Sequence, residues 1–504
     1  MASASGREVY EKVRAVSYGA LVTITGTGVK RLLVVITNVL LTRYLRPLSY
    51  SAFALCWRVV QGLKQFIPLG STVTVVRDGA RSRSRSDRSE TAMLAYGTTL
   101  IGGLLFSVSI YLLAPVLNFY TLNVPELTVA FGVAELTLPF TGLVLINGHF
   151  LRGQEKIEQL LLLKDIGWPL TRLLSVIVAL YLSYELIGVL AMLCLGTALL
   201  GISGVVQTLR VTDTGFRVPS LNRMKSFYNH SIPSALTYVG KLLRIDILIF
   251  FLGFFAVDQA PGQYNVILLL GKIAIIPLIG FNKLLPPIAS DLYARNEVEI
   301  LNDTYKAITR LITALTLPLI LFMMVFSQEL LHVFGRSYVP AYGALIVFLL
   351  GRLVGNCVGA TGWLLLMTDN QYLRLTIDWL LALINIPLSY YLIVHYGLFG
   401  ASVVYLFQRG FQNMIQLVVL RKLEGLFPYD WAYLKPLVAS SVMGVTMVVV
   451  KLGQFPIAAK VLLGGIVGTL SYSIVLNYLG LEELDRKLIS GLRDGFRRFI
   501  EIQR

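Results

Sequence analysis

Charged residues are scarce in this sequence, making up 14% of its 504 residues, whereas hydrophobic residues make up 56% and the mean hydropathy is +0.71. That balance excludes a soluble protein and predicts a polytopic membrane protein. A cleavable signal is also missing, because the polar residues Arg7, Glu8 and Lys12 lead directly into an apolar segment long enough to span a bilayer. We therefore expect the first helix to remain in the mature protein.

The usual marks of enzymes and metal proteins are missing as well. The three cysteines show no CxxC spacing and the four histidines stand alone, so neither a disulfide framework nor a metal centre is expected. No GxxxxGKS loop is present to bind ATP, and the expected outer connections are too short to present catalytic carboxylates or histidines. We expect no enzyme activity and no cofactor, while coupling to H+ or Na+ stays open.

A net charge of +16 and the basic run Arg81–Arg85 would suggest nucleic acid binding in a soluble protein. Here the run lies in a short connection between two apolar segments, where Lys and Arg mark the cytoplasmic side. We therefore expect no nucleic acid partner.

Long apolar segments are abundant. About fourteen of them reach the roughly 20 residues that cross about 30 Å of hydrocarbon. They predict an all-α polytopic membrane protein with transmembrane helices near residues 17–42, 48–76, 91–116, 125–150, 158–183, 185–209, 229–255, 261–286, 306–327, 339–366, 372–394, 397–420, 431–451 and 456–478.

Basic residues gather on one set of alternating connections, including Arg77–Arg88, Arg210–Lys225 and both ends of the chain, and are rare on the other set. This positive-inside bias predicts that both termini are cytoplasmic. We expect a multi-pass protein of the plasma (cytoplasmic, inner) membrane.

The chain also repeats itself at an offset of about 211 residues. Tyr184–Gly188 before the sixth segment resembles Tyr396–Gly400 before the twelfth, and Leu209–Arg210 matches Leu420–Arg421. Two six-helix lobes in parallel orientation follow, an arrangement in which transporters bind substrate between the lobes. The expected domains are an N-terminal lobe at 1–210, a cytoplasmic linker at 211–226, a C-terminal lobe at 227–425, two extra helices within 426–479 and a cytoplasmic amphipathic tail at 480–504.

Basic side chains within the apolar segments are the main functional signal. Each would cost about 2.5 to 3.5 kcal/mol if it faced lipid at mid-bilayer, so together they predict a cationic cavity that binds an anion. Arginine suits a diphosphate or an acidic sugar, because its fork donates two hydrogen bonds and keeps its charge. Basic residues near segment ends, such as Arg374, are instead expected to snorkel to the interface. The substrate-binding candidates are Arg31, Arg58, Lys64, Lys241, Arg244, Arg352 and Arg409.

Acids within the segments are fewer. Asp165 shares a helical face with Arg172, and Asp246 lies close to Lys241 and Arg244, so either aspartate could neutralise a neighbour. Glu135 has no basic residue in its own segment, where desolvation would favour proton exchange. Glu135 and Asp246 are the candidates for ion coupling.

Several short motifs follow one another in a fairly specific order: Leu41–Arg43, Leu45–Pro47, Ser51–Phe53, Arg244–Asp246, Gly262–Tyr264, Leu285–Pro287, Phe334–Tyr338, Asn385–Leu388 and Tyr396–Ala401. Together they resemble the Wzx-like polysaccharide flippases of the multidrug/oligosaccharidyl-lipid/polysaccharide (MOP) exporter superfamily over nearly the whole chain. The sequence departs from the family at Ser51, where glycine is common.

The resemblance implies a V-shaped, MATE-like arrangement of two six-helix lobes plus two extra C-terminal helices. It also implies alternating access that moves polyisoprenyl-phosphate-linked or polyisoprenyl-diphosphate-linked oligosaccharide from the cytoplasmic to the outer leaflet, with ion antiport. The product would serve assembly of surface polysaccharide, O-antigen or glycoprotein glycan. The implied partners are the lipid-linked oligosaccharide, membrane lipids, and glycosyltransferases or a polymerase of the same pathway.

Two alternatives remain. A multidrug/cation antiporter of the same superfamily would need acids and aromatics in its cavity, and a non-transporting scaffold of a glycan-assembly complex would have no reason to retain costly cations. The sequence does not give the glycan, the carrier lipid, the coupling ion or the oligomeric state.

Overall fold

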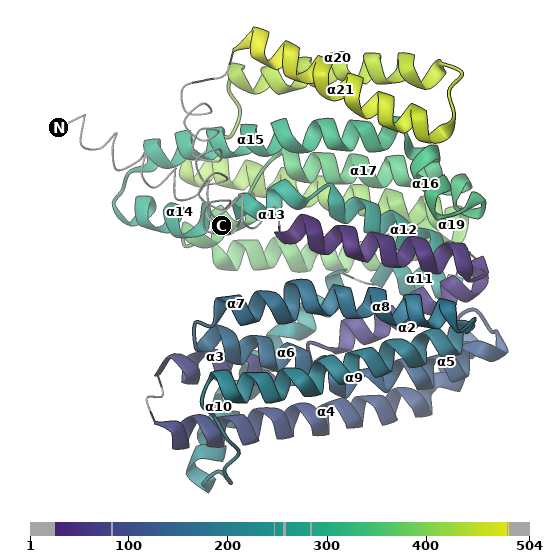
Figure 1. Cartoon of the computed structure of the whole chain (residues 1–504). Helices are drawn as coiled ribbons and strands as arrows, with labels where there is room; N and C mark the ends of the chain where they lie inside the picture. Colours follow the sequence, from purple (N-terminus) through teal and green to yellow (C-terminus); the bar gives the residue numbers. More distant parts are fainter. Residues whose placement is uncertain are drawn as a thin grey trace, which may run out of the picture. The chain divides into compact units, whose positions relative to one another are not determined.

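The computed structural model is helical in every regular element that it describes, over residues 26–81, 84–245, 247–255, 259–282, 285–480 and 482 (Figure 1). Side chains are described except at 80–81, 157 and 236–247. The all-α class is therefore confirmed. The predicted amphipathic tail, apart from Gly480 and Glu482, lies outside the described residues.

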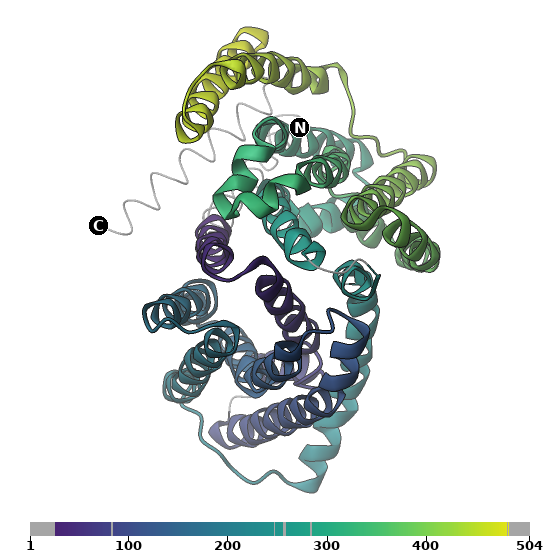
Figure 2. The same ribbon diagram turned by 90° about the vertical axis from the view of Figure 1, so that its right-hand side faces the viewer.

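Contacts divide the chain into two compact units, which we treat separately as the N-unit, Val29–Val266, and the C-unit, from Ile267 onward. The N-unit begins with a helix over 26–44. It continues with α2 (Pro47–Leu63), α3 (Ser71–Arg81), α4 (Arg85–Tyr120), α5 (Pro125–Glu135), α6 (Thr137–Gly153), α7 (Ile157–Leu160), the π-helix η1 (Leu161–Gly167), α8 (Trp168–Tyr181), α9 (Leu186–Val211), α10 (Leu221–Ile245), α11 (Ile247–Phe255) and the start of α12 (Ala260–Ile273). Figure 2 views most of these helices end-on.

The C-unit holds the rest of α12 and a second set of helices. They are α13 (Ile276–Asn282), α14 (Leu285–Ala294), α15 (Val298–Val325), α16 (Ser327–Phe334), the 3-10 helix η2 (Arg336–Ala341), α17 (Tyr342–Cys357), α18 (Thr361–Met367), α19 (Gln371–Glu424), the 3-10 helix η3 (Trp431–Tyr433), α20 (Leu434–Leu452) and α21 (Ile457–Leu479). The last two lie side by side and pack on α15 (Figure 1), where the Tyr472 hydroxyl donates a 2.8 Å hydrogen bond to the Ala314 carbonyl.

In the described part of the chain, eight helical segments are long and apolar enough to cross a membrane, or nine if the bent pair Ala260–Ile273 and Ile276–Ala294 forms one span. The chain is therefore a multi-pass membrane protein. The count of fourteen stays a prediction, because several predicted segments are broken: 48–76 divides into α2 and α3, and 158–183 contains the π-helix. Segments 372–394 and 397–420 together form α19, whose backbone is non-helical at Gly397. The lobe boundaries, the repeat, the V shape and the orientation also stay predictions.

The turn between α2 and α3 depends on Gly70. Its φ is +76°, in the left-handed region that favours glycine, and it lies directly against the backbone of α10. A β-carbon there would lie 1.9 Å from the Ser231 carbonyl oxygen and 2.7 Å from the Ala235 nitrogen. Close by, the hydroxyls of Thr74 and Ser231 form a 2.8 Å hydrogen bond. The middle of α10 is thus held tightly against the start of α3.

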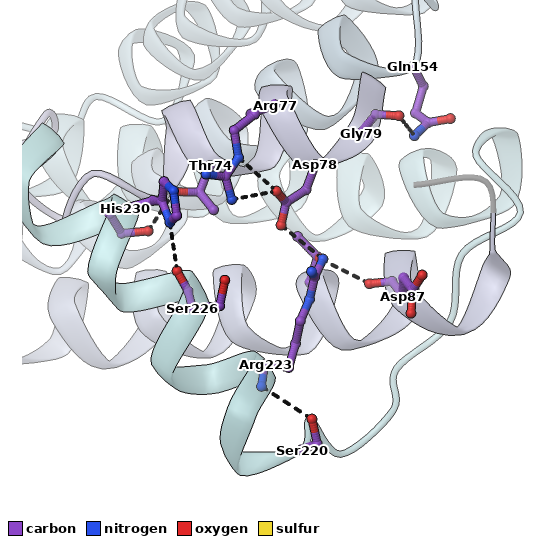
Figure 3. A network of polar contacts seen from close by, with 12 residues as sticks. Thr74, Arg77, Asp78, Gly79, Asp87, Gln154, Ser220, Arg223, Ser226 and His230 are labelled. Carbon is purple, nitrogen blue, oxygen red and sulfur yellow. Dashed lines mark hydrogen bonds and ion pairs between the residues drawn. The ribbon is translucent and has the colours of Figure 1, made fainter. Parts of the chain in front are cut away.

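A charged network joins α3, α4 and α10 further along (Figure 3). Asp78, whose side chain is only 7% exposed, accepts hydrogen bonds from Arg77 and from Arg223 of α10, both at 2.9 Å. Arg223 also donates a 2.7 Å hydrogen bond to the Thr91 hydroxyl of α4. One buried carboxylate therefore fixes the first turn of α10 to α3.

We expect removal of this buried pair to weaken the N-unit. Asp78→Asn and Arg223→Gln should each lower the free energy of unfolding by about 1 to 3 kcal/mol, because each leaves a desolvated partner. The double variant should lose less than the sum, which thermal melting in detergent would show. The exposed pair Arg85–Asp213 gives a matched control: Arg85→Gln should change stability by no more than about 0.5 kcal/mol. Equal losses of unfolding free energy at the buried and the exposed pair would contradict a stabilising role of the Asp78–Arg223 pair.

Candidate functional site

A pocket of about 280 Å³ with both apolar and polar walls lies within the C-unit, among the residues around α13, α17, α18 and both arms of α19. At about 30 Å³ per water molecule, it has room for roughly nine waters or for a phosphate group with some hydration. Three arginines line it, Arg352, Arg374 and Arg409. The other polar side chains on its wall are Asn282, Asn356, Thr361, Trp363, Tyr405, Gln412, Asn413 and Gln416.

Arg352 and Arg409 meet at one aromatic ring. Their guanidinium carbons lie 4.9 and 5.7 Å from the ring centre of Tyr405. Tyr405 and Arg409 are one turn apart on α19, so they share a face. Gly351 lets α17 approach that face, since a β-carbon there would lie 2.9 Å from the Leu406 Cα. Close helix packing thus places two cations on one wall of the pocket.

Arg374 completes the set from the other arm of α19. Its Nη1 donates a 2.6 Å hydrogen bond to the Gly362 carbonyl, and its guanidinium lies 5.8 Å from the Trp363 ring centre. Asp378, one turn later, lies 4.0 Å from Arg374 Nε and accepts a 2.7 Å hydrogen bond from Gln412. Three arginines thus line the pocket, no acid is among its described lining residues, and Asp378 lies beside Arg374.

The structure brings two of the predicted substrate-binding residues together in this pocket and adds a third arginine, while their role in substrate binding stays a prediction. Arg352 and Arg409 line the pocket as a cationic site requires, whereas Arg374 was expected to snorkel. Two sequence signals indicated a polar interior around Arg374. Arg374 lies one helical turn before Asp378, and the facing segment carries the amides Gln412 and Gln416.

Arg58 belongs to a buried polar chain in the N-unit. Its Nη2 donates a 3.0 Å hydrogen bond to Asn265 Oδ1, the Asn265 amide donates to the Tyr50 hydroxyl at 2.9 Å, and that hydroxyl donates to Asn38 Oδ1 at 2.9 Å. The first helix, α2 and α12 are joined by these bonds. Ser51 also contacts α12, because its hydroxyl accepts a 3.1 Å hydrogen bond from the Gly262 N–H.

We expect Tyr50→Phe to break this chain. Loss of one hydroxyl removes the partner of the Asn265 amide and of Asn38 Oδ1, both of which are buried. The cost should be about 1 to 3 kcal/mol for the desolvated groups. A lower melting temperature for Tyr50→Phe than for Tyr111→Phe, an exposed tyrosine of α4, would support this; equal values would contradict it.

The pairing of Asp165 differs from the sequence-based hypothesis. Asp165 lies in the π-helix and binds Lys30 of the first helix at 2.8 Å, whereas Arg172 stacks on Trp57 with 4.2 Å from its guanidinium carbon to the ring centre. A π-helix has more residues per turn than an α-helix, so residues seven apart across it no longer lie on the same face. The α-helical spacing that placed Asp165 beside Arg172 therefore does not apply here.

The remaining candidates are spread over the N-unit. Arg31 is half-buried, and its Nε has no hydrogen-bond partner among the described residues. Lys64 caps α2 and donates to Gln61. Glu135 is fully buried at the end of α5. The side chains of Lys241, Arg244 and Asp246 lie outside the described set, so a single cavity that unites all seven cations stays a prediction.

No group of three or more His, Cys, Asp or Glu residues suited to a metal ion is found in the described ranges.

Comparison with known proteins identifies the class. The model of the family described as "Polysaccharide biosynthesis protein" matches residues 16–290, more than half of the chain. The chain therefore belongs to the polysaccharide biosynthesis protein family, as its motifs predicted. No curated protein sequence matches it.

Solved structures with the same fold come from the MOP superfamily. A lipid II flippase MurJ in an inward closed conformation has a TM-score of 0.70 at 13% identity, with 91% of this chain and 98% of that chain covered. An inward-facing multidrug resistance MATE family transporter has a TM-score of 0.65 at 15% identity, with 78% of this chain and 94% of that chain covered. A MOP superfamily transporter from Pyrococcus furiosus has a TM-score of 0.55 at 14% identity, with 82% of this chain and 95% of that chain covered. The chain thus shares the fold of these flippase and transporter structures.

Proposed function

We propose that this protein is a flippase for oligosaccharides linked to a polyisoprenyl phosphate or diphosphate, which it moves from the cytoplasmic to the outer leaflet of the plasma membrane by alternating access. The observation that carries the proposal is the three-arginine pocket of the C-unit. Family membership supports the sugar part of the substrate, and the MOP fold supports transport.

The pocket fits the charged part of such a substrate. Guanidinium groups bind phosphate oxygens through paired hydrogen bonds, and Arg352 and Arg409 are held in place by Tyr405. The neighbouring amides of Asn413, Gln412 and Gln416 can donate to and accept from sugar hydroxyls. Substrate binding would also offset the mutual repulsion of the three cations.

The same charge argues against the alternative of a multidrug/cation antiporter. A cationic drug would be repelled by a pocket with three arginines and one carboxylate. A scaffold without transport activity would not need the pocket at all.

Translocation in proteoliposomes tests the proposal. The probe is a fluorescent polyisoprenyl-diphosphate oligosaccharide, whose arrival in the other leaflet is detected by a membrane-impermeant quencher. We expect protein-dependent translocation of this probe and none of a cationic dye. Dye transport without glycolipid movement would establish the antiporter instead, and movement of neither would favour the scaffold.

A further inference from the structure

Glu135 is a buried acid that takes no part in the polar clusters described above. It is the last residue of α5, its exposed fraction is 0%, and neither carboxylate oxygen has a hydrogen-bond partner among the described residues. A carboxylate charge in such surroundings would cost several kcal/mol. A neutral carboxylic acid avoids most of that cost, so these surroundings favour the protonated form.

The helix is interrupted at Glu135, and Pro139 explains the interruption. A regular helix would pair the N–H of residue 139 with the Glu135 carbonyl oxygen, but proline has no N–H. The Ser107 hydroxyl of α4 donates to this carbonyl instead, at 2.6 Å. The acid therefore lies at a joint between α5 and α6, where a side chain of α4 and not the helix itself satisfies the Glu135 carbonyl oxygen.

Among the described residues, two cysteines and a tyrosine are the titratable side chains that we find around Glu135. On the helices that pack against α5, the Cys56 thiol of α2 lies within electrostatic range of its carboxyl group. Tyr111 of α4 packs against Gly132, and Cys194 of α9 contacts Thr137 at the start of α6. None of these groups donates a hydrogen bond to the carboxyl oxygens.

The charged residues of the same helices are engaged or distant. Arg58 of α2 is bound to Asn265. Arg152 of α6 lies 17 residues after Glu135 in the chain. The charged residues at the start of α4, Arg85–Glu90, lie at least 17 residues before Ser107, the residue of α4 that contacts Glu135. At 1.5 Å per residue, 17 residues of helix correspond to about 25 Å. Among the described residues, therefore, no cation forms a hydrogen bond with the Glu135 carboxyl group while it is occluded.

We propose that Glu135 is a proton-binding site: it holds a proton while the joint is closed and releases it to water, as a carboxylate, when the joint opens during transport. This inference rests on the proposed function, since proton release requires that the N-unit change conformation in a transport cycle.

The protonation state is tested without substrate. Infrared difference spectra of the purified, full-length protein at neutral pH should show the C=O band of a protonated carboxylic acid, and the band should be lost in Glu135→Gln. Glu126→Gln, an exposed acid on the same helix, should keep the band. Absence of the band in the wild type, or its persistence in Glu135→Gln, would overturn the proposal whether or not the protein is a flippase.

Coupling is tested by an imposed pH gradient. In proteoliposomes with the polyisoprenyl-diphosphate probe, the gradient should change the initial rate at least severalfold for the wild type and for Glu126→Gln. Glu135→Gln should translocate the probe at a rate that does not respond to the gradient. An equal response of Glu135→Gln and the wild type, or no response of a wild type that does move the probe, would overturn coupling. If the probe does not move in any variant, the proposed function fails and the infrared result still decides the protonation of Glu135.

Discussion

Replacement of both Arg352 and Arg409 by glutamine should lower the initial rate of translocation of the polyisoprenyl-diphosphate probe by about a hundredfold or more. A hydrogen bond to a charged group contributes about 1.5 to 3 kcal/mol, and every 1.4 kcal/mol corresponds to a factor of ten. Both side chains contact the Tyr405 ring and line the same pocket, so the variant removes two of its three cations.

The matched control is Arg421→Gln, an exposed arginine at the end of the same helix, which should translocate at the wild-type rate. The lysine variants separate charge from geometry: Arg352→Lys with Arg409→Lys should give an intermediate rate, because lysine keeps the charge but not the bidentate fork. Melting temperatures should stay close to wild type, since each cation–π contact contributes only about 0.5 to 1 kcal/mol. Undiminished transport in the double glutamine variant would remove the pocket from the mechanism.

Gly70→Ala should be the most damaging single substitution in the N-unit. An alanine there adopts an unfavourable positive φ, and its β-carbon would overlap the Ser231 carbonyl oxygen and the Ala235 nitrogen. Both are backbone atoms of α10, so relief requires α3 and α10 to move apart. Strain of about 1 to 3 kcal/mol and overpacking of a similar size should together lower the melting temperature by on the order of 10 °C.

Gly97→Ala in α4 is the control for a glycine substitution, because a β-carbon at that position meets no atom within 4 Å. It should leave the melting temperature unchanged or raise it slightly, since alanine favours the helix by about 0.5 to 1 kcal/mol over glycine. Similar melting temperatures for Gly70→Ala and Gly97→Ala in detergent would show that the contact between α3 and α10 does not limit stability.

Part of the candidate site was predictable from the sequence and part was not. Arg352 and Arg409 stood out because a charge within an apolar segment needs a polar environment. Arg374 was expected to snorkel because it lies near a segment end, and only the tertiary structure places it in the wall of the pocket, beside Asp378. Arg58 donates to Asn265, which is 207 residues away, and no local pattern connects the two.

The sequence by itself determined that this is an all-helical, multi-pass membrane protein of the polysaccharide biosynthesis class. The physical reason is that a backbone in hydrocarbon must satisfy its own hydrogen bonds, so apolar segments of membrane length can only be helices. The tertiary structure alone decided which polar groups share a site. It gathers three arginines in the C-unit pocket, binds Arg58 to Asn265, and leaves the Glu135 carboxyl group without a hydrogen-bond partner among the described residues. These outcomes depend on where breaks such as Gly70, Pro139 and Gly397 redirect the helices, and on packing between residues far apart in the chain.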